Sequence, residues 1–528
     1  MKLFKIAAFY LTIATSLLPL VANADTLQVA PQQDLRPVLS DLGTHCGPLP
    51  ASLDTAALTR LQAFYNQQNG VSAWQDGTQL QQLTEQLARL VDDGLNPADY
   101  PYPLSSQHAQ GRADCADILT SHAYLQALLH LRRGRISVPK TEALWRTASL
   151  PPADAELATL SLAIANLAAP AKAFDEARPT SSRYLNLRKV YASQRQRPLS
   201  QWPSIGQGKL LKANGMDERL PVLRSRLEAE GYLTISPEHT DNRYDSATQQ
   251  ALEHFQSAHG LNPDGVLGPA SIRELNIPAQ QRLDQLRANL ERLRWQADDL
   301  SISKVVINIP ASELLILKDD QIQWRTRTQV GRSDRQTPLL LSRLNRLSLN
   351  PTWTVPPTIL RKDKLPAIRE DISYLSRHGL SVLDRDGTAL DPHDVDWHNP
   401  GNIMLRQAAG SQNPLGRVAF RFDNPFAVYL HDTPSQSLFS KAPRAFSSGC
   451  VRVENVDNFF NWLLSPDELV TVTKHIESGK TLQYRLQQPA VILMTYWTAE
   501  ADQNGTLTYY PDVYERDVQL ISALNTAR

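Results

Sequence analysis

The chain has 528 residues, and its 54 lysines and arginines equal its 54 aspartates and glutamates. That length exceeds what one hydrophobic core supports, so it predicts several domains. The balanced charge argues against a nucleic-acid partner, which requires a basic face.

The first residues have the pattern of an export signal. Lysines at positions 2 and 5 precede an apolar run that ends in the small residues Ala22 and Ala24. This pattern predicts a secretory signal peptide over residues 1–24, with an uncleaved anchor as the alternative. Nothing later has the unbroken apolar length of a spanning helix, so we expect no membrane span in the mature protein.

Three cysteines occur, at positions 46, 115 and 450. In an oxidising compartment Cys46 and Cys115 are able to pair, which leaves Cys450 free. Such a bridge closes a long loop and stabilises by about 3–4 kcal/mol. The alternative is two unpaired buried thiols, and the sequence leaves both open.

Residues 25–212 have a helical pattern. Leu83, Leu87 and Leu90 recur at helical spacing, and Gly94 ends that run. Alanine and leucine are frequent and β-branched runs are few, which favours an all-α domain. This region predicts a helical scaffold and indicates no activity.

Residues 213–278 differ in sequence pattern from the helical region before them. Ser246 with Gln249 predicts a capping box, and Gly260 ends the helix that follows. The stretch resembles the peptidoglycan-binding module of cell-wall enzymes, which implies a small three-helix fold. Because most matched positions build turns and core, ligand binding by this copy stays open. The matched residues are Tyr244, Asp245, Thr248, Phe255, Gln256, Gly260, Leu261, Asp264, Gly265, Gly268, Pro269, Leu275 and Asn276.

A linking helix is predicted over 279–300, and from 301 the apolar period becomes two. Asp319 and Asp320 lie between two alternating runs, as a hairpin turn requires. Further strand patterns predict a mainly antiparallel β domain over 301–528. Residues 358–400 are rich in charge, Pro and Gly and do not resemble strands, so we interpret them as an insertion that caps a cleft. A last hairpin is predicted around Asn504-Gly505.

The stretch Ser-Ser-Gly-Cys-Val-Arg places Cys450 on a loop before a strand. A free thiol has a pKa near 8.5, so a nucleophilic cysteine needs a nearby base. His431 ends the preceding strand, and two strand ends joined by one loop are able to lie side by side. Amides around Ser448, Gly449 and Cys450 are suited to face a developing oxyanion. The alternative is a buried structural thiol with a surface histidine.

The stretches "HDTP", "SSGCVRV" and "GRSDRQTP" resemble the YkuD-type catalytic domain of L,D-transpeptidases. The order of domains resembles the large periplasmic, YcbB-like branch of Gram-negative bacteria. One departure matters: many relatives have histidine directly before Gly-Cys, where this chain has Ser448. The resemblance implies a multidomain α+β protein, in which a helical scaffold and a small three-helix peptidoglycan-binding module precede a mainly antiparallel β catalytic domain with a capping insertion.

Carried over to this chain, the resemblance makes Cys450 the nucleophile and His431 the general base and then acid. Ser448 and Gly449 become the oxyanion segment. Arg452 is either a contact for a substrate carboxylate or a structural clamp. Tyr429 shares a strand face with His431 and either lines the cleft or packs as an ordinary aromatic.

No acidic partner for His431 is evident, because Asp432 is adjacent in the strand and points away. We therefore expect a backbone carbonyl to orient the ring. No cofactor and no metal are implied. His393 and His398 form the only metal-like cluster, in a polar turn-like stretch that we interpret as surface.

The implied reaction is acyl transfer on peptidoglycan in the periplasm, with tetrapeptide stems as donor and acceptor. The thiolate attacks the carbonyl after the third-position diaminopimelate, D-alanine leaves, and a neighbouring stem amine resolves the thioester. Other cell-wall synthases are possible partners. Two alternatives remain: transfer to water or a D-amino acid, or a non-catalytic wall-binding scaffold. The intact His431 and Cys450 weigh against the latter.

Overall fold

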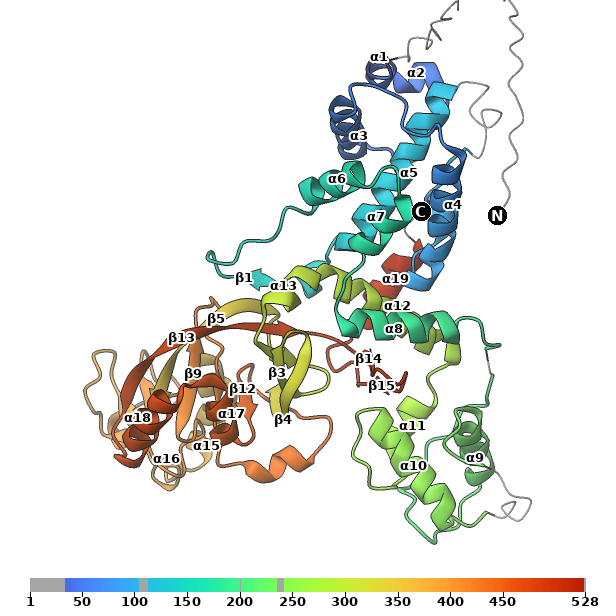
Figure 1. Ribbon diagram of the computed structural model, residues 1–528. Coiled ribbons are helices and arrows are strands. Elements are labelled where there is room, and N and C mark those ends of the chain that lie inside the picture. Colours follow the sequence, from blue (N-terminus) through green and yellow to red (C-terminus); the bar gives the residue numbers. More distant parts are fainter. Residues whose placement is uncertain (1–33, 104–112, 200, 235–241, 527–528) are drawn as a thin grey trace, which may run out of the picture.

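The computed structural model describes residues 34–103, 113–199, 201–234 and 242–526. The predicted signal peptide, residues 1–24, lies outside these ranges. A helical body, a small helical module and a β-rich domain are distinct in Figure 1. Within the described ranges, no helix combines the length and apolar character needed to span a membrane.

The helical body is the scaffold predicted from the sequence. Leu83, Leu87 and Leu90 are buried, and Gly94 ends their run with a φ of 73°. The central helix α5 is surrounded by the others, so most of its residues are buried. The helices are α1 Arg36–Ser40, α2 Leu42–Cys46, α3 Thr55–Gln67, α4 Gly77–Arg89, α5 Ala113–Arg133, α6 Ala155–Ala165, α7 Pro170–Ala177 and α8 Ser182–Gln194.

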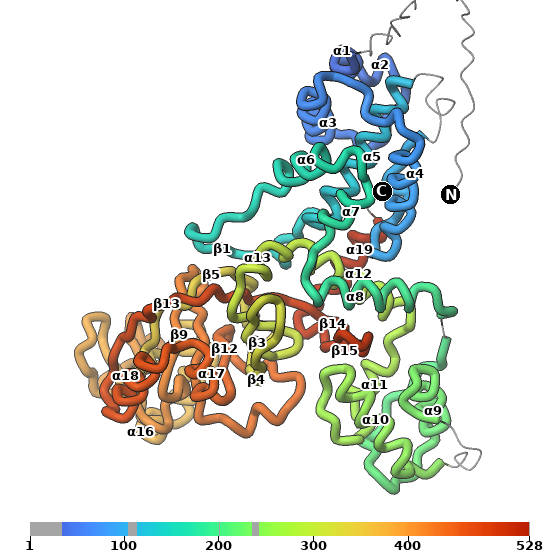
Figure 2. The backbone as a smooth tube through the Cα atoms, in the orientation of Figure 1, coloured from blue at the N-terminus to red at the C-terminus, as the bar shows by residue number. Residues whose placement is uncertain are grey.

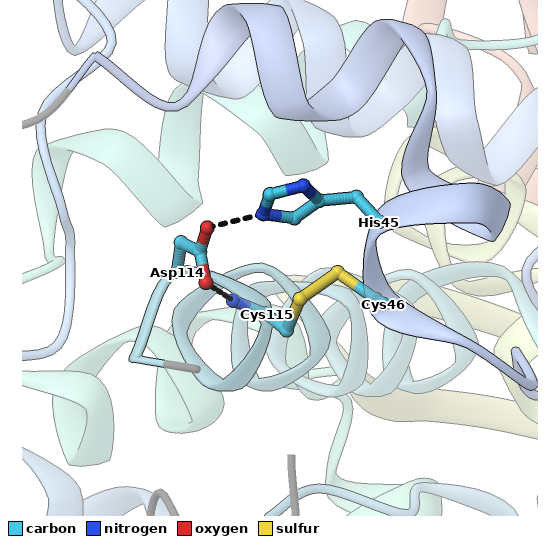
Figure 3. The surroundings of a disulfide bond; sticks show 4 residues. All are labelled: His45, Cys46, Asp114 and Cys115. Atoms are coloured by element: carbon cyan, nitrogen blue, oxygen red, sulfur yellow. Dashed lines mark hydrogen bonds and ion pairs between the residues drawn. A yellow bond between two sulfur atoms is a disulfide. The ribbon is translucent and has the colours of Figure 1, made fainter. Parts of the chain in front are cut away.

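A disulfide joins α2 to the start of α5. Cys46 and Cys115 are bonded, which settles the alternative that the sequence left open. Beside the bridge, the Nε2 atom of His45 lies 2.6 Å from a carboxylate oxygen of Asp114 (Figure 3). The N-terminal helices are therefore tied covalently to the centre of the scaffold.

The module contains three helices, α9 Leu220–Ala229, α10 Ser246–Ala258 and α11 Pro269–Leu275, around one apolar core. The predicted capping box at Ser246 was wrong by one residue. Asp245 is the N-cap, and its carboxylate accepts from the Thr248 amide at 2.7 Å. A carboxylate at this position also suits the partial positive charge of a helix N-terminus.

The linking segment forms helices α12 Ala279–Trp295 and α13 Ala297–Ile302. Leu286, Leu290 and Leu293 of α12 belong to an apolar cluster that includes residues of α8 and of the catalytic sheet. Arg292 is buried between carboxylates of Glu142 and Asp517. Asp517 starts α19 Asp517–Thr526, so the end of the chain returns to the scaffold, as the tube in Figure 2 shows. The three regions are therefore packed together through α12.

The main sheet is mixed. Most neighbours are antiparallel, and the pairs β1–β5, β2–β13, β4–β11 and β10–β12 are parallel. Its order is β1-β5-β13-β2-β3-β4-β12-β10-β9, and β9 also pairs with β5, so the sheet closes on itself. The strands are β1 Trp145–Arg146, β2 Val305–Asn308, β3 Glu313–Lys318, β4 Gln321–Gly331, β5 Leu340–Leu349, β9 Val418–Phe422, β10 Leu430–His431, β11 Ala445–Ser447, β12 Val451–Val453 and β13 Leu482–Thr495.

The predicted hairpin turn at Asp319-Asp320 is present, and both residues have positive φ. This is the geometry of a tight two-residue hairpin turn. The predicted C-terminal hairpin is also present, as β14 Ala499–Ala501 paired with β15 Leu507–Tyr509. Helices α17 Val456–Leu463 and α18 Pro466–Glu477 contribute to the apolar core of the sheet.

The insertion has an apolar core of its own, which includes Leu365, Ile368 and Trp397. The prediction that residues 358–400 hold no strand was wrong for β7, which pairs with β8 in a three-stranded sheet. Its elements are β6 Trp353–Thr354, α14 Pro357–Ile359, a π-helical turn Leu360–Lys364, α15 Leu365–Glu370, α16 Tyr374–Arg377, β7 Leu380–Leu383 and β8 Met404–Gln407. The insertion is therefore a small subdomain and not a loop.

Candidate active site

The register of two short strands places four of the predicted site residues on one face of the sheet. In β10 and β12, Leu430 pairs with Val451 and His431 with Arg452. Leu430 and Val451 belong to the apolar core. Because side chains alternate along a strand, Tyr429, His431, Cys450 and Arg452 all lie on the opposite face.

Cys450 is the free cysteine of the chain and is partly exposed. Its Sγ atom lies 3.9 Å from the Ala427 carbonyl oxygen. Burial raises the pKa of the Cys450 thiol, although hydrogen bonding from Tyr429 and the charge of Arg421 favour the thiolate. The thiol is therefore protonated at neutral pH, in surroundings that stabilise the anion once it forms.

His431 is 5% exposed. Its Nδ1 atom lies 2.5 Å from the Asp432 carbonyl oxygen. A carbonyl only accepts, so Nδ1 carries the proton and Nε2 is left as the acceptor. Burial lowers the pKa of His431 to about 3, and the Arg452 guanidinium acts in the same direction. The imidazole is neutral. A backbone carbonyl orients it, and this orientation was expected from the sequence.

Cys450 and His431 are diagonal neighbours on adjacent strands, because Cys450 lies beside Tyr429 in this register. Among the residues that the structure describes, no hydrogen bond joins the two side chains. The Asp432 carboxylate points elsewhere and accepts from the Arg417 amide at 2.9 Å. The structure thus brings thiol and imidazole to the same face without a preformed ion pair.

The turn before the cysteine depends on Gly449, whose φ is 113°, a region that disfavours other residues. The Gly449 amide donates to the Ser447 hydroxyl at 3.1 Å. Its carbonyl accepts from the Thr337 hydroxyl at 2.8 Å. The Gly449 amide, predicted for the oxyanion segment, is therefore occupied. Within the described ranges, the amides of Ser448 and Cys450 have no acceptor.

Ser448 belongs to a clamp that was not predicted from the sequence. The Arg335 Nη1 atom donates to the Ser448 hydroxyl at 2.9 Å. The same guanidinium binds both carboxylate oxygens of Asp363 in the insertion, at 2.6 and 2.7 Å. The Arg335 side chain is only 8% exposed. We call Arg335, Asp363 and Ser448 the clamp, because they join the insertion to the loop of Cys450.

Two more arginines border the cysteine. The Arg421 guanidinium lies 3.8 Å from the centre of the Tyr429 ring, and burial raises the pKa of that tyrosine. Arg452 donates from Nη1 to the Gln329 side chain at 3.0 Å, while its buried Nε has no partner. Arg421 was not predicted from the sequence. The alternation of Val418–Phe422 was the available signal, since Phe420 lies in the core and Arg421 opposite.

A single group of closely spaced His, Cys, Asp or Glu ligand atoms occurs in the described ranges, at His45, Asp114 and Cys115. Cys115 is disulfide-bonded, so its sulfur is not a free thiolate ligand. His393 and His398 belong to no such group among the described residues. The arrangement around Cys450 places a free thiol beside an imidazole, the combination that nucleophilic acyl transfer uses.

Comparison with known protein families matches three stretches of the chain. Residues 303–476 match the YkuD family, described as the L,D-transpeptidase catalytic domain. This chain contains an L,D-transpeptidase catalytic domain. Residues 59–190 match a scaffold domain. Residues 217–275 match a "Putative peptidoglycan binding domain".

A Haemophilus influenzae protein named "Putative L,D-transpeptidase" is 34% identical over 281 residues, which are 51% of this chain. The match spans 56% of that relative, or about half of its length. A solved L,D-transpeptidase from Xylanimonas cellulosilytica is 18% identical and covered completely, over 57% of this chain, with a TM-score of 0.18. A solved L,D-transpeptidase from Mycobacterium smegmatis is 16% identical. The match covers 36% of this chain and 58% of that chain, with a TM-score of 0.18. The identification of the domain depends on the sequence matches.

Proposed function

We propose that the protein is a periplasmic L,D-transpeptidase that joins third-position diaminopimelate residues of two peptidoglycan stems. Cys450 forms the thioester and D-alanine is released. The observation that carries the proposal is the common face of Cys450, His431, Tyr429 and Arg452 within an L,D-transpeptidase catalytic domain. The donor and acceptor are tetrapeptide stems.

In the first step, the Cys450 sulfur attacks the carbonyl carbon after diaminopimelate, and its proton passes to His431 Nε2. Both groups are neutral at rest, so the proton moves during attack and not before it. A small rotation on substrate binding brings the diagonal neighbours together, as catalytic contacts often tighten only in the complex. The oxyanion accepts hydrogen bonds from the free amides of Cys450 and Ser448.

The tetrahedral adduct then collapses. The carbon–nitrogen bond breaks, the proton on His431 goes to the departing amine, and D-alanine leaves as a neutral amine before its usual protonation in water. In the second step, the side-chain amine of another stem attacks the thioester, and His431 removes its proton. A new amide bond forms and the Cys450 thiol is regenerated, so no outside energy source is needed.

Arg421, Tyr429 and Arg452 support the anionic stages. Arg421 and Tyr429 favour the thiolate, as the pKa of Cys450 reflects. The free Nε of Arg452 offers a donor for a carboxylate of the stem peptide. The hydrogen bond from Arg452 to Gln329 supports a structural role for this arginine as well.

The test is turnover of disaccharide-tetrapeptides by the purified protein, followed by mass spectrometry. We expect cross-linked dimers together with released D-alanine, and neither from Cys450→Ala. Dimers formed by that variant would remove the assignment of the nucleophile. Tripeptides without dimers would favour the second candidate, an L,D-carboxypeptidase, which the partial exposure of Cys450 to water also permits.

A further inference from the structure

A tight loop between β4 and β5, residues 331–337, is hydrogen-bonded to the turn that carries Cys450. At its start, a Cβ atom on Gly331 would lie only 2.7 Å from the Thr337 amide nitrogen, so the close approach requires glycine. The Thr337 hydroxyl accepts from the Gly331 amide at 2.8 Å and donates to the Gly449 carbonyl at 2.8 Å. Thr337 is 0% exposed, so both hydrogen bonds are shielded from water.

The Gly449 carbonyl and the Cys450 amide belong to one peptide unit. This unit is trans, so its C=O and N–H groups point in opposite directions. Because Thr337 holds the carbonyl toward the interior, the Cys450 N–H points away from the interior. Thr337 therefore sets the direction of a proposed oxyanion donor without contacting a substrate.

The Ser447 hydroxyl holds the rest of this turn. It accepts from the Gly449 amide at 3.1 Å and donates to the Cys450 carbonyl. Both carbonyls and one amide of Gly449 and Cys450 are thus bound to side chains. The Cys450 amide is left for a ligand, since it has no acceptor in the part of the chain that the structure describes.

The Tyr514 hydroxyl closes the same loop from the other side. It accepts from the Thr337 amide at 3.0 Å and donates to the Gly331 carbonyl at 2.7 Å. Tyr514 is itself fixed, because its ring stacks on Tyr496 and its amide donates to the Tyr496 hydroxyl at 2.8 Å. Tyr514 follows the stretch 303–476 that matches the catalytic family, so the C-terminal segment supplies this support.

We propose that Thr337 is a positioning residue for the oxyanion stage of acyl transfer at Cys450, and that Tyr514 holds Thr337 in place. The proposal rests on the proposed function only for acyl transfer at this cysteine. Both residues act through the direction of the Cys450 amide. Steps that develop an oxyanion therefore depend on them, whereas direct substitution at the sulfur does not.

The test compares two reactions of Cys450 in the full mature chain. p-Nitrophenyl acetate transfers its acetyl group to the sulfur through an oxyanion, while p-nitrophenolate leaves and the thiol proton passes to His431. Iodoacetamide loses iodide from a saturated carbon and forms no oxyanion. We expect Thr337→Val to lower acetylation, and kcat for tetrapeptide stems, about tenfold or more, with alkylation and KM within about twofold of wild type. Thr337→Ser keeps the hydroxyl and should restore the wild-type rates.

Tyr514→Phe removes the hydroxyl one step further from the cysteine, so acetylation should fall about threefold with alkylation unchanged. Thr159→Val in the scaffold and Tyr244→Phe in the module are the matched controls. Their buried hydroxyls donate to the carbonyls of Ala155 and Gly265, both at 2.6 Å. Both controls should leave acetylation and alkylation at the wild-type rates.

Equal loss of acetylation and alkylation in Thr337→Val would make its role structural and overturn the proposal. Unchanged acetylation and stem turnover would overturn it as well. If Thr337→Val does not fold, the same comparison is made with Tyr514→Phe, and if the ester does not react, kcat for stems is compared with alkylation. A wild type that is acetylated but forms neither dimers nor tripeptides from stems would contradict only the proposed function. A wild type that neither acyl donor modifies would contradict both.

Discussion

The two cysteine environments of the molecule have opposite designs. Cys46 and Cys115 are 8% and 0% exposed inside the helical scaffold, and each is the other's partner. Cys450 is partly exposed on a strand face with no second thiol near it. Its neighbours are arginines, a tyrosine hydroxyl and a histidine. The comparison shows that the surroundings, and not the sulfur, separate a bonded structural cysteine from the one proposed as the nucleophile.

Among the variants that test this comparison, Cys450→Ala should have the largest effect, which is the loss of turnover. Removing a covalent nucleophile should lower transpeptidation by at least about a thousandfold. The unfolding transition in urea should stay within about 0.5 kcal/mol of wild type, since a partly exposed thiol contributes little packing. Cys450→Ser is the control for shape, and substantial turnover by it would contradict the assignment of the sulfur as nucleophile.

The pH dependence of Cys450 alkylation tests the electrostatic surroundings of this cysteine. Since the pKa of Cys450 is raised and that of His431 lowered to about 3, no thiolate–imidazolium pair exists between pH 5 and 7. The rate of iodoacetamide reaction should therefore rise about tenfold per unit from pH 6 to 8. A plateau in that range would reveal a preformed pair. His431→Ala should keep the slope while abolishing turnover.

The opposite substitution removes the structural pair. The Cys46→Ala/Cys115→Ala variant loses a bridge between residues 69 apart in sequence, which should lower the free energy of unfolding by about 4 kcal/mol. Urea denaturation would measure this. Transpeptidation at a temperature where the variant is folded should match wild type. Reductant should destabilise wild type and leave the double variant unchanged, which separates the bridge from side-chain packing.

The clamp tests how the loop of Cys450 is held. Asp363→Asn weakens the bidentate pair with Arg335 and frees the insertion from Ser448. We expect a decrease in kcat of about three- to tenfold, because positioning is lost and not the nucleophile. Asp371→Asn is the matched control: its carboxylate pairs with Arg377 in the same insertion, away from the loop. Equal effects of both variants would reduce the clamp to general stabilisation.

Prediction from sequence succeeded where the cause is local. Apolar periodicity and the residues that end helices and strands predicted the scaffold helices, the Asp319-Asp320 turn and the strand that ends at His431. A backbone carbonyl was expected beside His431 because no acidic partner was evident, and the Asp432 carbonyl takes that position. The clamp was not predictable, because Arg335 and Asp363 meet only after the insertion folds on its own core. The sequence did not decide whether Cys46 and Cys115 are bonded, because their Cα separation of 5.6 Å results from packing and not from their spacing in the chain.

The smallest effect concerns the carboxylate beside the bridge. Burial opposes ionisation of Asp114, but hydrogen bonds from His45 and the Cys115 amide outweigh it and lower the pKa of Asp114. A folded pKa below the unfolded value of about 3.9 means that the ionised group stabilises the fold above that pH, and that this is lost as pH falls through the folded pKa. Asp114→Asn should therefore cost less than about 1 kcal/mol at pH 7 and less still at pH 3. Urea unfolding at pH 7 and at pH 3 measures both losses of stability. A larger loss at pH 3 would contradict a lowered pKa of Asp114.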